Sequence, residues 1–454
     1  MSSDEELLWE VRISMPEIEH SDFIRERRAK LQSALLEAKN DQESGRGAKP
    51  LIQRVPAYLI DIKEDFKKYF EPRWVAIGPF HHRNPKFEQG EHTKLKLAAL
   101  FAEENETTDA VLFNEIKKEI KDLRTCYNPE DIKDYDDDEL AWMFFVDGSA
   151  VLYAVHYGLL RGEFQKLNIK AELVVLKVLD FFLLENQLPY QVLKILIRLA
   201  KEPREWEKSI TEFIRYSVIT YTRDGKSQNP EEEEEEQEFT HLLERLRTKH
   251  LTGEREWSSS SMIGHLLLSG GDNRKHVKTI RRIKDLKEIG ISVRPSESEN
   301  LKNISFYCNL RGTLKMPCIL VDDSTATKFL NLLALEMCRD FENDLAITSF
   351  LCFLGSLIDT AEDVKELRLT GILHSYLGSD EEVAELFCRM SRDLVPDLAI
   401  YYDVADRIHR YYNSRVMWIY SNYFGSNWSF LAFLGAVIGL SLTVIQTYFS
   451  AKTK

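Results

Sequence analysis

The sequence ends with a long apolar stretch that constrains the architecture more than any other feature. It runs from Trp428 to Phe449 (WSFLAFLGAVIGLSLTVIQTYF) and contains no charged residue. At a rise of 1.5 Å per residue, such a helix is about 33 Å long, enough to cross the hydrocarbon of a bilayer. Trp428 and Tyr448 lie where interfacial aromatic residues are found. We therefore predict a transmembrane helix at 428–449, followed by a short tail at 450–454.

Two glycines in this stretch lead to a second prediction. Gly435 and Gly439 form a GxxxG pattern, in which small residues allow two membrane helices to approach closely. The pattern indicates a homodimer through Gly435 and Gly439. The alternative for the whole stretch is a buried core helix, because several of its residues are small or polar. Core helices of soluble proteins, however, are seldom this long without a charge.

Charge and the N-terminus constrain partners and topology. The 454 residues carry a formal net charge of −14, whereas nucleic-acid affinity depends on clustered Lys and Arg. We therefore expect no nucleic-acid binding. The acidic start, MSSDEELLWEVRISM, lacks the basic and apolar regions of a secretory signal. The simplest topology is a single-pass protein with a cytosolic body. An extracellular body is the alternative, and it would make the sequons at Asn105 and Asn303 glycosylation sites.

The rest of the chain divides into an extension and a body. Helical periodicity from Ser21 and the polar segment DQESGRGAKP predict that residues 1–50 form an N-terminal helical extension and linker. Residues 51–420 are expected to form a large helical body. Within it, residues 224–238 (DGKSQNPEEEEEEQE) contain no apolar residue and predict an acidic disordered loop.

Two internal segments refine the fold class. Residues 171–188 (AELVVLKVLDFFLLENQL) predict an apolar core helix that Pro189 ends or kinks. Short β-rich runs between 291 and 322 are separated by proline and glycine and predict a small sheet. The expected fold is therefore mainly α, or α+β with a small β-rich segment near 291–322, plus one C-terminal transmembrane helix.

Three acidic or histidine clusters have the residue types of enzymatic sites, but each has a structural interpretation. His81-His82 lacks a third metal ligand at helical or hairpin spacing, which favours a polar turn. Asp322-Asp323 precedes an apolar helical pattern, as an N-cap does. Asp359-x-x-Glu362 and Ser379-x-x-Glu382 have the spacing of capping boxes.

A fourth cluster, Glu185-Asn186-Gln187, is polar in an apolar setting. One interpretation is that its side chains satisfy backbone groups freed by Pro189. The other is a ligand pocket at Glu185, Asn186 and Gln187. The sequence has no P-loop, no GxSxG, no kinase signature, no HExxH and no CxxC. We therefore predict a protein that is not an enzyme, with no catalytic residues, cofactor or metal site.

Taken in order, several motifs resemble a plant family, the domain-of-unknown-function family 247, also called the UPF0481 proteins. The segments that carry the resemblance are Ile52–Pro56, Glu71-Pro72, Val75–His82, Asp147-Gly148, Asp180–Pro189 (DFFLLENQLP, similar to DLLLLENQIP), Asp285–Gly290, Leu314–Asp323, Leu330–Leu332, Asp359–Val364, Leu377–Val383 and Tyr423–Ser450. At Leu335-Glu336-Met337 the chain departs from the more common Phe-Glu-Gln. The resemblance implies a mainly helical plant membrane protein with one C-terminal span and no established catalytic residues. Some members in grasses are linked to pollen-side self-incompatibility.

These observations leave three functional hypotheses. The first is a non-enzymatic, membrane-anchored recognition or signalling protein that binds a protein or peptide partner, as in plant self-incompatibility. Its specificity would lie in the loops Arg223–Glu238 and Glu254–Ser261, because loops on a rigid scaffold carry binding. The second is an unrecognised enzyme or small-ligand binder with a pocket near Glu185–Gln187. The third is a passive membrane tether.

Overall fold

The computed structural model describes residues 25–33, 35–36, 51–62, 64–159, 180–221, 238–252, 282–308, 311–338, 341, 344–413 and 427–452. The chain divides into two compact units, Met1–Lys49 and Pro50–Lys454. Within the first unit, residues 25–33 and 35–36 are helical and exposed. The predicted acidic loop lies outside the described residues except for Glu238, as does all of 254–261.

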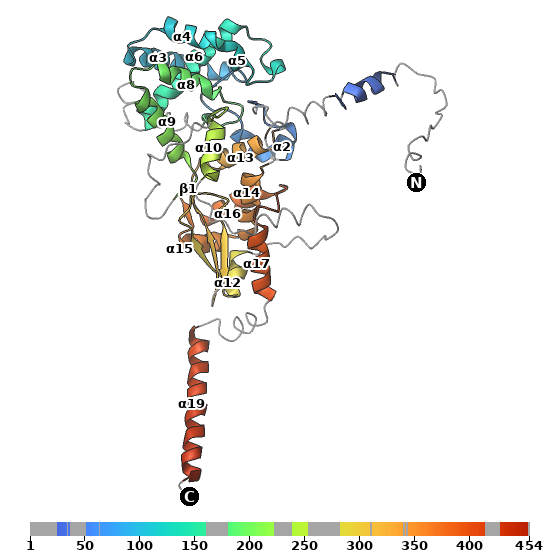
Figure 1. Ribbon diagram of the computed structural model, residues 1–454, viewed down its shortest axis with the longest axis vertical. Coiled ribbons are helices and arrows are strands. Elements are labelled where there is room, and N and C mark those ends of the chain that lie inside the picture. The colour runs from blue at the N-terminus through green and yellow to red at the C-terminus, as the bar shows by residue number, and fades with distance from the viewer. Residues whose placement is uncertain are drawn as a thin grey trace, which may run out of the picture. The chain divides into compact units, whose positions relative to one another are not determined.

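The second unit is mainly helical, as predicted (Figure 1). Its helices are α2 (Ala57–Ile62), η1 (Glu64–Tyr69), η2 (Pro85–Phe87), α3 (Glu88–Glu104), α4 (Asp109–Lys118), α5 (Ile120–Arg124), η3 (Pro129–Asp131), α6 (Asp137–Tyr153), η4 (Ala154–Leu159), α8 (Tyr190–Leu199), α9 (Pro203–Ser217), α10 (Leu242–Leu251), α12 (Ile283–Glu288), α13 (Thr325–Glu336), α14 (Ala346–Leu357), α15 (Ala361–Thr370), α16 (Asp380–Ser391), α17 (Tyr402–Asn413) and α19 (Asn427–Lys452).

The buried helix α6 organises the first half of the body. Its start is fixed by a capping box between Asp136 and Glu139, and from Met143 to Tyr153 every residue is buried. Helices α3, α4 and α8 pack around it. Gly148 allows the close approach of α8, because a Cβ atom at this position would lie 2.6 Å from Leu196 Cδ1. Burial on all sides explains why α6 is apolar enough to resemble a membrane span while serving as a core helix.

Two small sheets belong to the second half of the body. One has the order β2-β4-β3 and the other β1-β5-β6. The strands are β1 (Thr220–Tyr221), β2 (Ser292–Pro295), β3 (Ser305–Cys308), β4 (Gly312–Met316), β5 (Cys318–Val321) and β6 (Leu373–Ser375). Four of them fall in the predicted β-rich segment near 291–322, which is thereby confirmed. β1 and β6 are too short to give a periodic signal, and each is recruited by pairing with β5.

The helix starts in this half agree with one of the three predicted caps. Ser379 caps α16 by accepting the N–H of Glu382 at 3.1 Å. The cap predicted at Asp322-Asp323 was wrong, because the N-cap of α13 is Ser324 and Asp322 accepts the Ser324 N–H at 2.9 Å in the turn that precedes the helix. The capping box predicted at Asp359-x-x-Glu362 was wrong by one residue, since Thr360 and Asp363 form it. Asp363 is buried, whereas Glu362 is exposed and binds Lys284.

The predicted helix at 171–188 requires a correction. Residues 171–179 lie outside the described residues, but residues 181–189 form turns and irregular backbone. Phe181 to Leu184 are all buried, so their run of apolar residues reflects complete enclosure and not one face of a helix. Of the polar residues that follow, Asn186 and Gln187 donate to the backbone carbonyls of Asp180, Phe181 and Leu183, in place of a helical hydrogen-bond ladder.

The C-terminal helix α19 contains both ends of the predicted span, Trp428 and Phe449 (Figure 1). Its segment Leu431–Ser450 has a mean hydropathy of 1.7, and none of it is buried against the rest of the chain. A long, uncharged and uncovered apolar helix is consistent with a single-pass membrane anchor.

Candidate functional site: a buried polar junction

The predicted polar cluster lies in a larger group of buried polar side chains. We call this group the polar junction; it comprises Lys94, Asp147, Asp180, Glu185, Asn186, Gln187 and Asn331. α3 supplies Lys94, α6 supplies Asp147, and α13 supplies Asn331. The remaining four residues lie in or next to the irregular segment 181–189. Except for Glu185, each is almost completely buried.

Asp180 and Asn186 hold the extended segment that begins at Arg73. The Asp180 carboxylate accepts the N–H groups of Arg73, Trp74 and Val75, at 3.1, 2.8 and 3.1 Å. Burial raises the pKa of Asp180, and the three N–H donors oppose that rise. Asn186 Oδ1 accepts the Ile77 N–H at 2.7 Å. These side chains therefore satisfy backbone donors that belong to no helix or sheet.

The amides of Asn186, Gln187 and Asn331 stabilise the irregular segment itself. Asn186 Nδ2 donates to Asp180 O at 2.9 Å and to Val75 O at 3.0 Å. Gln187 Nε2 donates to Phe181 O and Leu183 O at 2.8 and 2.7 Å, while Asn331 Oδ1 accepts the Leu184 N–H at 2.8 Å. These side chains do bond to backbone groups, but none of the bonds described here is to a group freed by Pro189, so that part of the interpretation was wrong.

Lys94 and Asp147 form a buried ion pair at the centre of the junction. Lys94 Nζ lies 2.5 Å from Asp147 Oδ1, 2.6 Å from Ala76 O and 2.8 Å from Glu91 Oε1. Asp147 Oδ2 accepts the N–H of Gly78 at 2.8 Å. The ammonium thus donates to two acceptors and contacts the Glu91 carboxylate, and the Asp147 carboxylate has donors on both oxygens, which compensates for the loss of hydration.

A glycine is required at position 78, where the backbone passes close to the irregular segment 181–189. Its φ is +72°, and a Cβ atom at this position would lie 2.3 Å from Gln187 O. We predict that Gly78→Ala lowers the free energy of unfolding by about 2–3 kcal/mol, because it adds left-handed strain to a backbone clash. In the control variant Gly378→Ala, the new Cβ meets only Glu382 Oε2, at 3.4 Å. Equal urea-unfolding midpoints for the two variants would contradict this account of Gly78.

At the partly exposed edge of the junction, a histidine and an arginine face the Glu185 carboxylate. His81 Nε2 lies 3.3 Å from Glu185 Oε2, and Arg54 NH1 lies 3.6 Å from the same oxygen. Burial alone would raise the pKa of Glu185, but His81, the Val55 N–H and Arg54 outweigh burial and lower it. His82 faces Glu91 at 3.7 Å. The predicted polar turn at His81-His82 is confirmed, and each ring faces a carboxylate.

Residues 52–442 match the family DUF247, described as a plant protein of unknown function. The chain belongs to this plant family. A UPF0481 protein of Arabidopsis thaliana is 26% identical over 422 residues, covering 87% of this chain and 85% of the relative. A putative UPF0481 protein of the same plant is 31% identical over 175 residues, covering 37% of this chain and 33% of the relative. No solved structure matches the chain.

In this DUF247 chain, five of the motifs that carry the family resemblance meet at the polar junction. Val75–His82, Asp147-Gly148, Asp180–Pro189 and Leu330–Leu332 are far apart in sequence, yet each contributes a hydrogen bond described above. Ile52–Pro56 joins them, because the Val55 N–H donates to Glu185 Oε1 at 2.9 Å. The geometry therefore gives these motifs a common structural task, which is to hold α3, α6, α13 and the irregular segments together.

A second buried network was not anticipated from the sequence. Glu336, at the end of α13, accepts the N–H groups of Ile347 and Thr348 at 2.9 Å each and so caps α14. Arg247 of α10 donates to the same carboxylate from NH2 at 2.8 Å and contacts Asp344 at 3.2 Å. An available signal was a lone carboxylate within the apolar run of α13, because such a group must be paired when buried.

We expect two buried histidines to make the stability of this DUF247 body depend on pH. Burial lowers the pKa of His241 and of His250 from 6.5 to about 3. The positive charge of Lys328 also lowers the pKa of His250. Neutral His241 caps α10 by accepting the Glu244 N–H at 3.2 Å. Below pH 6.5 the two histidines are protonated in the unfolded chain, whereas in the folded chain they stay neutral down to about pH 3. The free energy of unfolding is therefore expected to decrease as the pH is lowered from 6.5 toward 3, by about 1.4 kcal/mol per pH unit for each histidine.

Urea unfolding of the detergent-solubilised protein between about pH 7 and pH 5 measures this slope. The double variant His241→Asn/His250→Leu should flatten the pH dependence, since Asn retains a capping acceptor. The exposed His374 provides the control, and His374→Gln should leave the slope unchanged. A slope that survives the double variant would contradict the assignment to these two residues.

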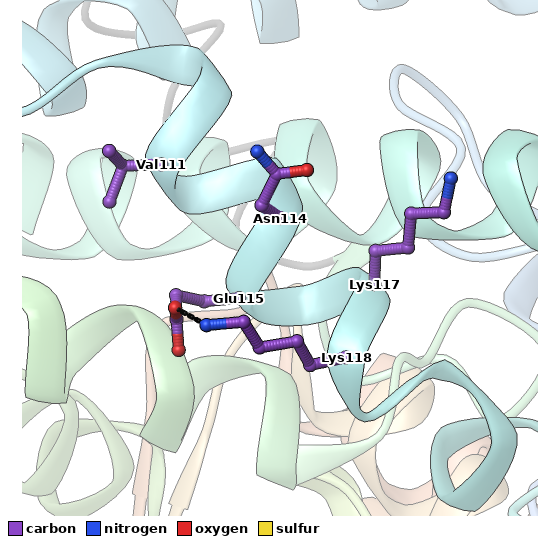
Figure 2. A pocket seen from close by; sticks show the side chains of 5 residues that line it. All are labelled: Val111, Asn114, Glu115, Lys117 and Lys118. Atoms are coloured by element: carbon purple, nitrogen blue, oxygen red, sulfur yellow. Dashed lines mark hydrogen bonds and ion pairs between the residues drawn. The ribbon is translucent and has the colours of Figure 1, made fainter.

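The other predicted site residues lie apart from the junction. Asn105 is buried: its Nδ2 donates to Phe101 O at 2.8 Å, and its Oδ1 accepts from Trp206 Nε1 at 3.1 Å. A glycan on Asn105 would require these hydrogen bonds to break. Asn303 is half-buried. A surface hollow lies on α4, lined by Val111, Asn114, Glu115, Lys117 and Lys118 (Figure 2). Ligand binding at Glu185, Asn186 and Gln187 stays a prediction.

Proposed function

We propose that this DUF247 member is a membrane-anchored recognition or signalling protein that binds a protein or peptide partner. The observation that carries the proposal is that the buried polar side chains form hydrogen bonds with the backbone of the body. The side chains of Asp180, Asn186 and Gln187 are hydrogen-bonded to backbone groups of the body and are not directed at a ligand. Together with the uncovered helix α19, this favours a rigid scaffold held at a membrane, whose surface is available for binding.

The specificity loops of the proposal are Arg223–Glu238 and Glu254–Ser261, and a pull-down from plant membranes tests them. Replacing both loops with Gly-Ser sequences of equal length should abolish capture of the partner that the native protein retains. Partner capture that is unaffected by both replacements would contradict the loop assignment. A role in self-incompatibility predicts in addition that the captured protein differs between compatible and incompatible pollination.

The second hypothesis is an enzyme or small-ligand binder with a pocket at Glu185. Its supporting observation is the group His81, Glu185 and Arg54 at the partly exposed edge of the junction. A metabolite that raises the melting temperature of the native protein but not of a Glu185→Gln variant would favour this reading. No stabilisation by any metabolite in the screen would remove its support.

The third hypothesis is a passive tether, and deletion of Trp428–Lys454 separates it from a binder. A binding protein without α19 should still capture its partner in solution. A tether should lose every measurable activity on leaving the membrane. The proposal of a single-pass anchor predicts that the same deletion releases the protein from membranes at alkaline pH.

We further propose that α19 forms a homodimer through Gly435 and Gly439. Apart from the neighbouring backbone of α19 itself, no atom of the described residues lies within 4 Å of a Cβ placed on either glycine. Gln446 follows Gly435 by eleven residues and Gly439 by seven, so helical periodicity places all three on one face. No hydrogen bond of the Gln446 amide is present among the described residues. An amide in hydrocarbon requires a partner, and the same amide of a second copy can supply it.

Disulfide crosslinking or energy transfer between labelled copies in vesicles tests the dimer. Gly435→Leu/Gly439→Leu is expected to abolish association, and Gln446→Leu to weaken it several-fold. Val444 lies on the opposite face, so Val444→Leu serves as the matched control. Association that responds equally to the Val444 variant, or to none of them, would contradict this interface.

A further inference from the structure

The sheet β2-β4-β3 has one side whose residues are exposed or half-buried. In strand register, Arg294, Lys315 and Ser305 form one row, and Ser292, Thr313 and Tyr307 form the next. The alternate residues Val293, Leu314 and Phe306 are buried on the opposite side. We call the six solvent-facing residues the basic sheet face, because they include two cations and no carboxylate.

The two cations of this face are placed side by side. Arg294 and Lys315 are direct neighbours on parallel strands, an arrangement in which like charges repel. Among the described residues, neither forms an ion pair with a carboxylate, and Lys315 Nζ lies 5.8 Å from the centroid of the Tyr307 ring. An anion at this face would relieve the repulsion.

Basic residues on neighbouring elements differ in this respect. On α12, Lys284 binds Glu362 at 2.8 Å and Lys287 binds Glu366 at 2.7 Å. Their charges are neutralised by α15, so they offer little to an external anion. The charge of the basic sheet face is thus a local property, in a chain whose formal net charge is −14.

The connection of the sheet to the anchor brings this face within reach of a bilayer. Its buried side packs on α17, where the Phe306 and Tyr411 ring centroids lie 5.7 Å apart. α17 ends at Asn413, and α19 begins at Asn427. A connection of this length spans at most about 45–50 Å when fully extended. The face is therefore tethered close to any membrane that holds α19.

We propose that the basic sheet face docks on anionic phospholipid headgroups of the membrane that anchors the chain. This inference rests on the proposed anchor. A negatively charged body is repelled by an anionic surface, and a face that carries only positive charge determines which side turns toward the membrane. Tyr307 is suited to the headgroup level, where amphipathic aromatic side chains are found. Because α19 keeps the surface at high local concentration, a weak contact is sufficient to orient the body.

Competitive amine labelling of the full-length protein in vesicles tests the docking. One vesicle type contains phosphatidylcholine alone, and the other contains phosphatidylserine in addition. Mass spectrometry reports the labelling of Lys315 relative to Lys208, an exposed residue of α9. We expect phosphatidylserine to reduce the Lys315 signal several-fold, and roughly 1 M salt to restore it by screening.

Charge variants provide the controls. Arg294→Glu should make the Lys315 labelling equal in the two vesicle types, whereas Arg204→Glu on α9 should leave the difference intact. Flotation of the vesicles separates the two claims. Protein absent from both floated fractions would overturn the anchor and the docking together. Protein that floats with both, but with Lys315 labelled equally, would overturn the docking alone and direct attention to an acidic protein partner.

Discussion

Replacing Lys94 with Met is expected to lower the free energy of unfolding by about 3–5 kcal/mol, because the change leaves a buried charge without its partner. Asp147 is 1% exposed, and Lys94 is the cation that faces it, at 2.5 Å. The variant also removes the donor to Ala76 O. Urea unfolding of the detergent-solubilised full-length protein, followed by circular dichroism, measures the loss.

Two further variants separate the ion pair from general effects of the substitution. Lys96 lies on the same helix and is exposed, so Lys96→Met should change the free energy by less than about 0.5 kcal/mol. The double variant Lys94→Met/Asp147→Leu should recover part of the loss, since it removes the orphaned carboxylate. A loss at Lys94 no larger than that at Lys96 would contradict the structural role of the junction.

Glu336→Ala is expected to lower the free energy of unfolding by a similar amount, about 3–5 kcal/mol, because it removes both a helix cap and an ion pair. The Ile347 and Thr348 N–H groups lose their cap at the start of α14. Arg247, which is 9% exposed, loses its closest carboxylate and retains Asp344 at 3.2 Å. The same denaturation experiment measures the change.

Glu336→Gln and Glu385→Ala are the matched comparisons. Gln retains an acceptor for the cap but no charge for Arg247, so it should destabilise less than Ala. Glu385 is exposed and pairs with Arg389 at 3.4 Å, an interaction worth at most about 1 kcal/mol. If Glu336→Ala destabilised no more than Glu385→Ala, the cap and the ion pair would not stabilise the fold as proposed.

The sequence predicted those parts of the fold that have a local signal. The uncharged run at 428–449 indicated α19, and the clustered β-branched residues with proline and glycine near 291–322 indicated the strands. Ser379 followed by Glu382 indicated the start of α16. Each of these features is encoded by neighbouring residues, so periodicity or turn chemistry is sufficient to detect it.

The polar junction could be predicted only in part, because it is assembled from distant segments. Asn186 was recognised as a polar residue that needs partners, but those partners include Val75 and Ile77, more than a hundred positions away. Lys94 was missed because one lysine in an amphipathic helix is usually exposed. The irregular backbone at 181–189 was mistaken for a helix, since complete burial and helical patterning both give apolar runs.

We propose that several family motifs stabilise the interior of the body, that α19 holds it at a membrane, and that its surface meets partners on the cytosolic side. Protease digestion of sealed membranes, combined with a glycosidase mobility shift of the full-length protein, tests this arrangement most directly. The account predicts that protease added from the cytosolic side removes the body and that the glycosidase produces no shift. A body that is protected, and that shifts through a glycan on Asn303, would contradict it and place recognition outside the cell.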